Sequence, residues 1–129
     1  MLQSFPIDFL IRIKNSSRAG QKKMTTPSSK FCISIAELLK RYGYISNYSV
    51  SEDVKKKITI DLIYQNNQPK ISEIKLFSKP GRRIYGKVTQ LPWGKTPYSL
   101  IIVSTPSGLM SQKEAKTKKL GGEIIAEIY

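Results

Sequence analysis

An apolar run leads into a hydroxyl-rich loop in the stretch Leu100-Ile101-Ile102-Val103-Ser104-Thr105-Pro106-Ser107-Gly108-Leu109-Met110-Ser111. The apolar part predicts a buried strand over residues 98–104, which delivers the loop to one edge of a sheet. The loop offers hydroxyl groups, backbone N–H groups and a glycine that permits close backbone approach, and a lysine-rich stretch follows it. We interpret this loop as a surface that binds a folded phosphate backbone. The residues that would make the contact are Ser104, Thr105, Ser107 and Gly108.

The second half of the chain favours strands on both sides of this loop. Upstream, a turn is predicted at residues 79–82 and a short extended piece at residues 83–85. Residues 91–97 predict a loop that carries an aromatic plug. Downstream, Ser111-Gln112-Lys113-Glu114 has the pattern of a capping box and predicts a short helix. Leu120-Gly121-Gly122 ends that helix, and residues 123–129 predict a closing strand.

The first half mixes helices with strands. Apolar residues from Phe5 to Ile13 recur at helical spacing, and the polar residues 15–17 predict the end of this first helix. A second helix is predicted to begin after Pro27-Ser28-Ser29, where a serine can cap it, and to end at Gly43. Strands are predicted at residues 24–26, 45–50, 57–64 and 71–78.

These patterns together predict an α+β protein with two small lobes. Residues 1–71 would form an N-terminal α/β lobe with the order helix-strand-helix-strand-strand, and residues 72–129 a C-terminal, mostly-β lobe with a short helix. A chain of 129 residues with 40% hydrophobic residues is large enough to bury a core in such lobes.

The charge is strongly positive and is spread along the chain. There are 22 basic and 9 acidic residues, which gives a net charge of +13. An excess of this size repels itself in a compact protein, and a polyanionic partner would neutralise it. A soluble basic protein with no such partner is the alternative.

Several kinds of chemistry are excluded by what the chain lacks. It contains no histidine and one cysteine, Cys32, so catalytic sites that use histidine and zinc sites with histidine or several cysteines are ruled out. Cys32 falls within a helical pattern and is interpreted as a core residue. No apolar run approaches the roughly 18 residues that a membrane helix needs, and the first residues lack the pattern of a secretory signal. We expect no cofactor and no metal; a Ser–Lys catalytic pair stays open as a remote alternative.

Basic and aromatic residues are interleaved instead, which is typical of RNA-binding surfaces. Residues 75–95 contain no acidic residue and include the three rings of Phe77, Tyr85 and Trp93. We favour a core position for Trp93, and we weigh a core position and an RNA contact equally for Tyr85. The candidate cations near the loop are Lys79, Arg82, Arg83, Lys113 and Lys116.

Three ordered motifs resemble a known family, the small-subunit ribosomal proteins number eight. Pro80-Gly81-Arg82-Arg83-Ile84-Tyr85 is similar to its Arg-Pro-Gly-x-Arg-Ile-Tyr segment, and Ser104-Thr105-x-x-Gly108 to its Ser-Thr-x-x-Gly signature. Leu120-Gly121-Gly122-Glu123 resembles the Gly-Gly-Glu motif near the C-terminus of the family's members. The likeness covers essentially the whole chain at the bacterial length. Departures are Pro106, where the family usually has serine, and two lysines of the following helix, where it often has arginine.

The resemblance implies a two-lobed, non-enzymatic protein that binds the central domain of small-subunit ribosomal RNA and contacts neighbouring small-subunit proteins. By motif position, the main RNA contact would be made by Ser104, Thr105, Ser107, Gly108 and Tyr85, with Glu123 in a supporting role. The N-terminal lobe would add further RNA contacts through Arg12, Lys14, Asn15, Lys22, Lys23 and Lys30.

We therefore expect a structural constituent of the small ribosomal subunit that recognises RNA by shape. Its location would be a bacterial cytoplasmic ribosome or an organellar ribosome, with no DNA or membrane partner. The first alternative is a free regulator that binds its own operon's messenger RNA, which some bacterial members of the family bind. The second is an RNA-processing enzyme.

Overall fold

The computed structural model describes residues 5–79, 81–96 and 98–129. The chain divides into two compact units. The N-terminal unit is Asp8–Ser72, and the C-terminal unit is Glu73–Tyr129 together with the described residues before Asp8. The predicted boundary followed residue 71. Both units combine helices with strands, so the fold class is α+β, as predicted.

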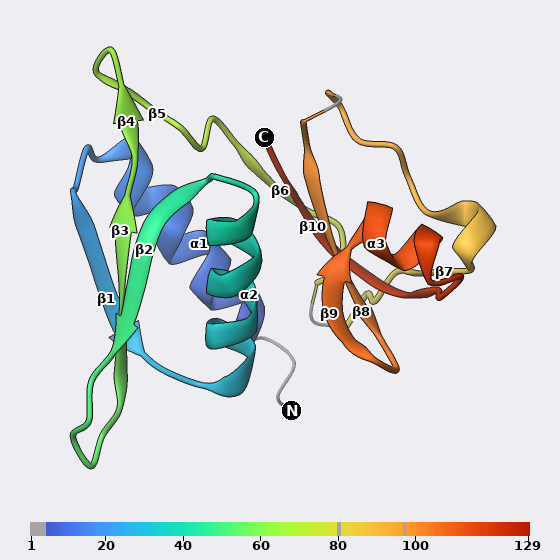
Figure 1. The fold of residues 1–129 in the computed structure, drawn as a ribbon, viewed down its shortest axis with the longest axis horizontal. Helices are drawn as coiled ribbons and strands as arrows, with labels where there is room; N and C mark the ends of the chain where they lie inside the picture. Colours follow the sequence, from blue (N-terminus) through green and yellow to red (C-terminus); the bar gives the residue numbers. More distant parts are fainter. Residues whose placement is uncertain (1–4, 80, 97) are drawn as a thin grey trace. The chain divides into compact units, whose positions relative to one another are not determined.

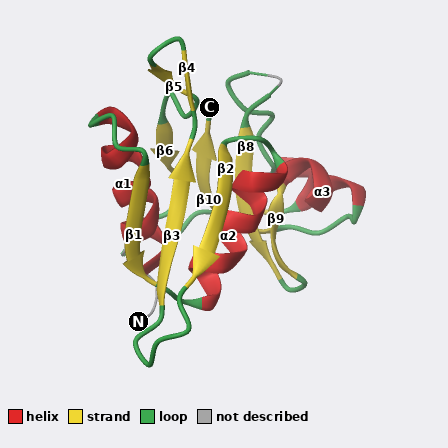
Figure 2. Ribbon diagram, turned by 60° about the vertical axis from the view of Figure 1, so that its left-hand side comes forward, coloured by secondary structure: helices red, strands yellow, loops and turns green. Residues whose placement is uncertain are grey.

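The N-terminal unit is a three-stranded antiparallel sheet with two helices over one face (Figures 1 and 2). The strand order is β1-β3-β2, with the central strand flanked by the two others. The strands are β1 (Lys23–Pro27), β2 (Ile45–Val50) and β3 (Lys57–Leu62), and the helices are α1 (Phe5–Arg18) and α2 (Lys30–Arg41). Because side chains alternate along a strand, Ile58 and Ile60 of β3 share one face, and both are fully buried.

Helix α2 begins and ends where the sequence predicts. The Ser29 hydroxyl accepts a hydrogen bond from the Cys32 N–H at 3.2 Å and thereby caps the first turn. Gly43, at φ +80°, follows the helix in the left-handed region that glycine favours. Cys32 is buried, as expected, and this burial raises the pKa of its thiol.

Two boundaries in this unit differ from prediction. Helix α1 continues to Arg18, because Ser16 and Ser17 are buried and serine is tolerated inside a helix that packs well. The strand predicted over residues 57–64 ends at Leu62, and a separate two-stranded ribbon follows, made of β4 (Tyr64–Gln65) and β5 (Gln68–Pro69). Asn66 and Asn67 form its turn with φ of 54° and 63°, a conformation that asparagine tolerates.

The C-terminal unit is built on an antiparallel sheet with the order β6-β10-β8-β9, and a short strand, β7, pairs with β10 as well. Its strands are β6 (Ile74–Leu76), β7 (Tyr85–Gly86), β8 (Leu100–Thr105), β9 (Gly108–Ser111) and β10 (Gly122–Ile128). The helical pieces are the 3-10 helix η1 (Val88–Gln90) and the helix α3 (Gln112–Thr117). The strand predicted over residues 71–78 is therefore only three residues long.

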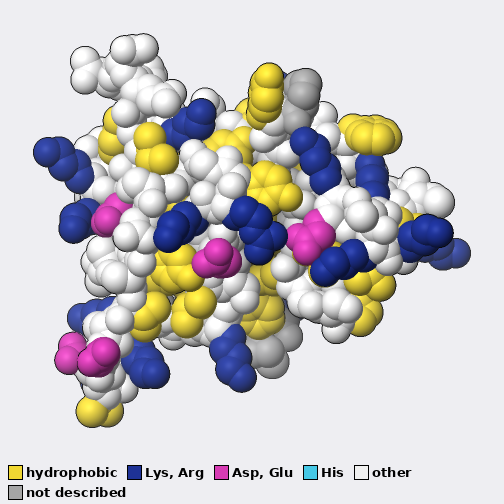
Figure 3. Space-filling view, viewed as in Figure 1, with side chains coloured by type: hydrophobic (Ala, Val, Ile, Leu, Met, Phe, Trp, Pro, Cys, Tyr) yellow, Lys and Arg dark blue, Asp and Glu magenta, His cyan; other side chains and the backbone are white. Residues whose placement is uncertain are grey.

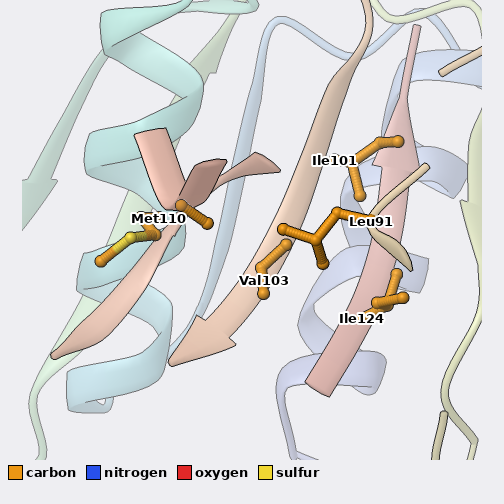
Figure 4. Close-up of a cluster of buried hydrophobic side chains, with 6 residues drawn as sticks. Leu91, Ile101, Val103, Met110 and Ile124 are labelled. Atoms are coloured by element: carbon orange, nitrogen blue, oxygen red, sulfur yellow. The ribbon is translucent and has the colours of Figure 1, made fainter. Parts of the chain in front are cut away.

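A compact apolar cluster holds this sheet to α3 and to the loop before β8. Figure 4 draws side chains of this cluster as sticks; those it labels come from β8, β9, β10 and the loop at Leu91. The buried members are Leu91, Ile101, Val103, Met110, Ala115 and Ile124. The buried strand predicted over residues 98–104 is confirmed in β8, which begins two residues later than expected.

Candidate nucleic-acid interface

The hydroxyl-rich stretch is a tight hairpin, whereas the sequence predicted a loop between a strand and a helix. Ser104 and Thr105 end β8, Gly108 begins β9, and Thr105 pairs directly with Gly108. Only Pro106 and Ser107 lie between the two strands. Proline fits here because its fixed φ suits a turn and its missing N–H is not needed for strand pairing.

The side chain of Thr105 fixes the shape of this hairpin. Its hydroxyl donates to the Gly108 carbonyl at 2.9 Å and accepts from the Ser107 N–H at 3.1 Å. Thr105 is only 8% exposed, whereas Ser107 and Gly108 are exposed at the tip. Gly108 has φ +113°, which a residue with a side chain rarely adopts. The hairpin therefore presents a defined tip, held from inside by a hydroxyl group.

Strand register brings three predicted site residues into one row. Glu123 of β10 pairs with Tyr85 of β7 on one side and with Ser104 of β8 on the other. Residues directly opposite each other in a sheet place their side chains on the same face. We call these three residues the cross-strand row. Tyr85 is 66% exposed, so it is no core residue and its ring is accessible.

A depression of about 830 Å³ lies over this row. Cations and hydrogen-bonding groups stand at its margin, including Lys87 of the turn before η1 and Lys119 after α3. Its lining residues are Tyr85, Gly86, Lys87, Val88, Gln90, Ser104, Pro106, Lys119, Gly121, Gly122 and Glu123. Lys87, Gln90 and Lys119 were not among the candidate site residues predicted from the sequence, although Lys87 and Lys119 lie in its basic stretches; the position of Lys119 two residues before the glycine pair was the available signal.

The glycine pair before Glu123 allows the strands to approach this closely. A Cβ atom on Gly122 would lie 2.0 Å from the Ser104 carbonyl oxygen. A Cβ atom on Gly121 would lie 2.5 Å from the Gly86 carbonyl oxygen. Both distances are below any contact that a real Cβ makes, so β10 can pass between β7 and β8 only with glycine at both positions.

Arg83 holds the carboxylate of the row. Its Nη1 lies 3.4 Å from each carboxylate oxygen of Glu123, and both side chains are more than two-thirds buried. Because the pair is partly withdrawn from water, it fixes the direction of the carboxylate more firmly than a surface ion pair would. Arg82 and Lys79 are exposed, and their backbones pair with each other across a turn.

The lysines of α3 are placed differently from one another. Lys113 is exposed at the start of the helix, whereas the Lys116 Nζ lies 3.4 Å from the centroid of the Trp93 ring. Trp93 is 79% exposed, so the expectation of a core position for this residue was wrong. The core beneath its loop is filled by Leu91 instead, two residues earlier.

In the N-terminal unit, the predicted cations are distributed over several elements. Arg12, Lys14 and Asn15 lie on α1, and Lys30 is the first residue of α2. Lys23 is the first residue of β1 and lies 3.7 Å from Asp61, and Lys22 directly precedes the strand. Figure 3 shows basic side chains scattered over the visible face, with fewer acidic side chains among them.

The part of the chain that the structure describes contains neither a candidate metal site nor a candidate membrane helix. No group of three or more His, Cys, Asp or Glu side chains there could hold a metal ion. Within the same residues, no helix has the length and apolar character to cross a membrane.

Comparison with known proteins gives consistent matches over nearly the whole chain. The model of a family described as ribosomal protein S8 matches residues 6–129. The small ribosomal subunit protein uS8 of Mesoplasma florum is 41% identical over 122 residues, which is 95% of each chain. The protein of the same name from Rhodospirillum centenum is 42% identical over 125 residues, or 95% of this chain and 94% of that one. That of Pelagibacter ubique is 41% identical over 131 residues and covers both chains completely.

Proposed function

Because the chain belongs to the ribosomal protein S8 family, we propose that it is a structural constituent of the small ribosomal subunit that binds ribosomal RNA. Proteins of this family are ribosomal proteins and not enzymes. The observation that carries RNA binding is the cross-strand row beneath the hairpin tip, where an exposed ring, a held carboxylate and a hydroxyl face one depression.

The proposed mechanism is recognition of RNA shape. The hairpin tip offers the Ser107 hydroxyl and a glycine backbone that RNA can approach closely. Tyr85 offers an exposed ring on which an unstacked base can lie. Glu123, held by Arg83, accepts hydrogen bonds and so supports the row. Thr105 shapes the hairpin from inside. Exposed cations around them collect phosphates, and these contacts position the protein without reading sequence.

We further propose that the RNA target is the central domain of the small-subunit ribosomal RNA. The C-terminal unit would make the specific contact, and the cations of the N-terminal unit would add charge. Its other partners would be neighbouring proteins of the small subunit. The relatives described above come from bacteria. Regulation of its own operon, through a similar RNA fold in the messenger RNA, is the second candidate function.

The test is to measure affinity for transcripts of the separate ribosomal RNA domains and for a scrambled RNA by filter binding. We expect the Ser107→Ala variant to bind its specific RNA more weakly by about 1–3 kcal/mol, because a hydrogen bond at the contact is lost. Affinity for scrambled RNA should not change. The matched control is Ser34→Ala, which removes an exposed hydroxyl from α2.

Equal losses on both RNAs would contradict a specific hairpin contact. Co-sedimentation of the protein with small subunits separates a ribosomal constituent from a free regulator. Incubation with labelled RNA and magnesium tests the enzyme alternative, for which we expect no turnover.

A further inference from the structure

Trp93 is the tryptophan of this chain, and its side chain projects from the C-terminal unit into solvent. It is 79% exposed, although a buried tryptophan ring contributes more apolar area than most side chains. It lies outside the depression described above, whose lining does not include it. The proposed RNA contact at the hairpin therefore gives this ring no role.

The loop that carries Trp93 is anchored on both sides. Leu91 is buried in the apolar cluster of the unit. The Lys95 N–H donates to the buried carboxylate of Glu127. Between them, Gly94 has φ +95°, and a Cβ there would lie 2.9 Å from the Ser99 Cβ. The ring is thus presented by a backbone that is fixed at both ends.

A cation covers one face of the ring. The Lys116 Nζ lies 3.4 Å from the ring centroid, in the geometry of a cation–π contact. With a lysine on one face and 79% of the residue still exposed, the opposite face is open. The lysine also restrains the ring, which lowers the entropy cost of placing a partner on that open face.

The charges around the ring favour an anionic partner. Residues 74–113 contain no acidic residue. Glu73 and Glu114 flank this stretch: Glu73 accepts from the Ile74 N–H at 3.0 Å, and Glu114 forms an ion pair with Lys118 at 3.2 Å. Glu127 accepts from the backbone of Lys95. An open aromatic face with a lysine on its other side matches an unpaired nucleotide, whose base stacks while its phosphate meets a cation. An apolar protein surface would leave the Lys116 charge without compensation.

We propose that Trp93 and Lys116 form a second RNA contact, in which an unpaired base of ribosomal RNA stacks on the open face of Trp93. The phosphate beside this base meets the Lys116 ammonium. This inference rests on the proposed function, because it requires that the protein bind ribosomal RNA, but it gives a role to Trp93, which the hairpin contact does not use.

The test uses the tryptophan as its own reporter. Because the chain has one tryptophan, its fluorescence reports on this position alone. The full-length protein is titrated with a transcript of the small-subunit ribosomal RNA, and filter binding on the same samples measures affinity. We expect the transcript to quench the tryptophan emission, since a stacked base quenches an indole. A fully paired RNA duplex, which has no unpaired base, should bind weakly and leave the emission unchanged.

Three variants separate stacking from other contacts. Trp93→Ala should lower affinity for the transcript about tenfold, in line with the loss of one base–aromatic stack. Trp93→Phe should keep most of the affinity because it keeps an aromatic face. Trp93→Leu should behave like Trp93→Ala, since it has apolar area without a π face. All three should fold as the parent does, because the replaced side chain is exposed.

Each other outcome overturns a particular claim. Normal binding by Trp93→Ala, with no quenching in the parent protein, would overturn the second contact and leave the proposed function intact. Recovery of affinity by Trp93→Leu would point to an apolar contact and would also overturn stacking. Failure of the parent protein to bind the transcript at all would overturn the proposed function itself.

Discussion

At the scale of single residues, two hydroxyl groups in the hairpin differ in what they contact. The Thr105 hydroxyl is bonded twice within the hairpin, to the Gly108 carbonyl and the Ser107 N–H. The Ser107 side chain stands at the exposed tip. Thr105 therefore contributes mainly to stability and shape, and Ser107 is the better candidate for a direct RNA contact.

Thr105→Val should expose this difference. It keeps the size of the side chain but leaves two backbone groups without their partner, so we expect the free energy of unfolding to fall by about 1–3 kcal/mol. Urea denaturation measures this loss. Ser107→Ala is the matched control and should change stability by less than about 0.5 kcal/mol, as for other exposed positions. A larger loss for Ser107→Ala than for Thr105→Val would contradict these roles.

Gly122→Ala should destabilise the protein through crowding. The new Cβ would lie 2.0 Å from a backbone oxygen of Ser104, which cannot move without shifting β8. We expect a loss of about 1–3 kcal/mol in the free energy of unfolding, measured by thermal or urea denaturation. Gly86→Ala is the control, because its Cβ would meet the flexible end of the Ile124 side chain at 3.1 Å. Equal stability of the two variants would show that β10 can shift away from β8.

At the scale of elements, sequence patterns predicted what local contacts determine. The cap at Ser29 and the helix that begins after Ser111 follow from nearby residues, so both were predicted correctly. The cross-strand row joins residues 85, 104 and 123, and its register depends on the packing of distant segments. The sequence therefore indicated several candidate residues but not that three of them face one depression. It also misplaced Trp93, because a ring between proline and glycine resembles a core plug until the burial of Leu91 is known.

Ser111→Ala should loosen α3. The Ser111 hydroxyl accepts from the Glu114 N–H at 3.1 Å and caps the helix that carries Lys113 and Lys116. We expect a loss of about 1 kcal/mol in the free energy of unfolding and faster hydrogen exchange at the Glu114 amide. Ser29→Ala removes the equivalent cap from α2 and should affect the Cys32 amide instead. Unchanged exchange at Glu114 would show that the cap is dispensable.

At the scale of the whole molecule, charge and recognition are carried by different residue types. Both halves are strongly basic: residues 1–70 hold 12 basic and 5 acidic residues, and residues 71–129 hold 10 and 4. The hydroxyl tip and the exposed tyrosine, however, belong to the C-terminal unit alone. Affinity for RNA in general should therefore depend on both units, and discrimination mainly on one.

Changing Lys22 and Lys23 together to alanine should lower affinity for specific and scrambled RNA alike. For the parent protein, counterion release predicts that the logarithm of the binding constant falls with the logarithm of the salt concentration with a slope of about −4 or steeper. The slope of the double variant should be shallower by up to about two. Tyr85→Ala should instead reduce discrimination and leave the slope unchanged. Filter binding at several salt concentrations measures both quantities. Alanine at both Lys55 and Lys56, which are exposed between β2 and β3, controls for charge alone.

A selective effect of the Lys22 and Lys23 changes, together with a uniform effect of Tyr85→Ala, would reverse the proposed roles of the two units. A nearly flat salt titration of the parent protein would show that its net charge of +13 is not used on RNA.

The close passage of β10 beside β8 also limits how this sequence can change by mutation. Every replacement of a glycine by another amino acid adds at least one carbon atom, and at Gly122 that atom meets the backbone of Ser104. The same backbone leads directly into the hairpin tip. A mutation that replaces Gly122 with another amino acid must therefore disturb the strand that presents the proposed RNA contact. Because the atoms it would meet belong to the backbone of Ser104 and Thr105, which any amino acid carries, no substitution in β8 removes the clash, and position 122 is expected to accept only glycine.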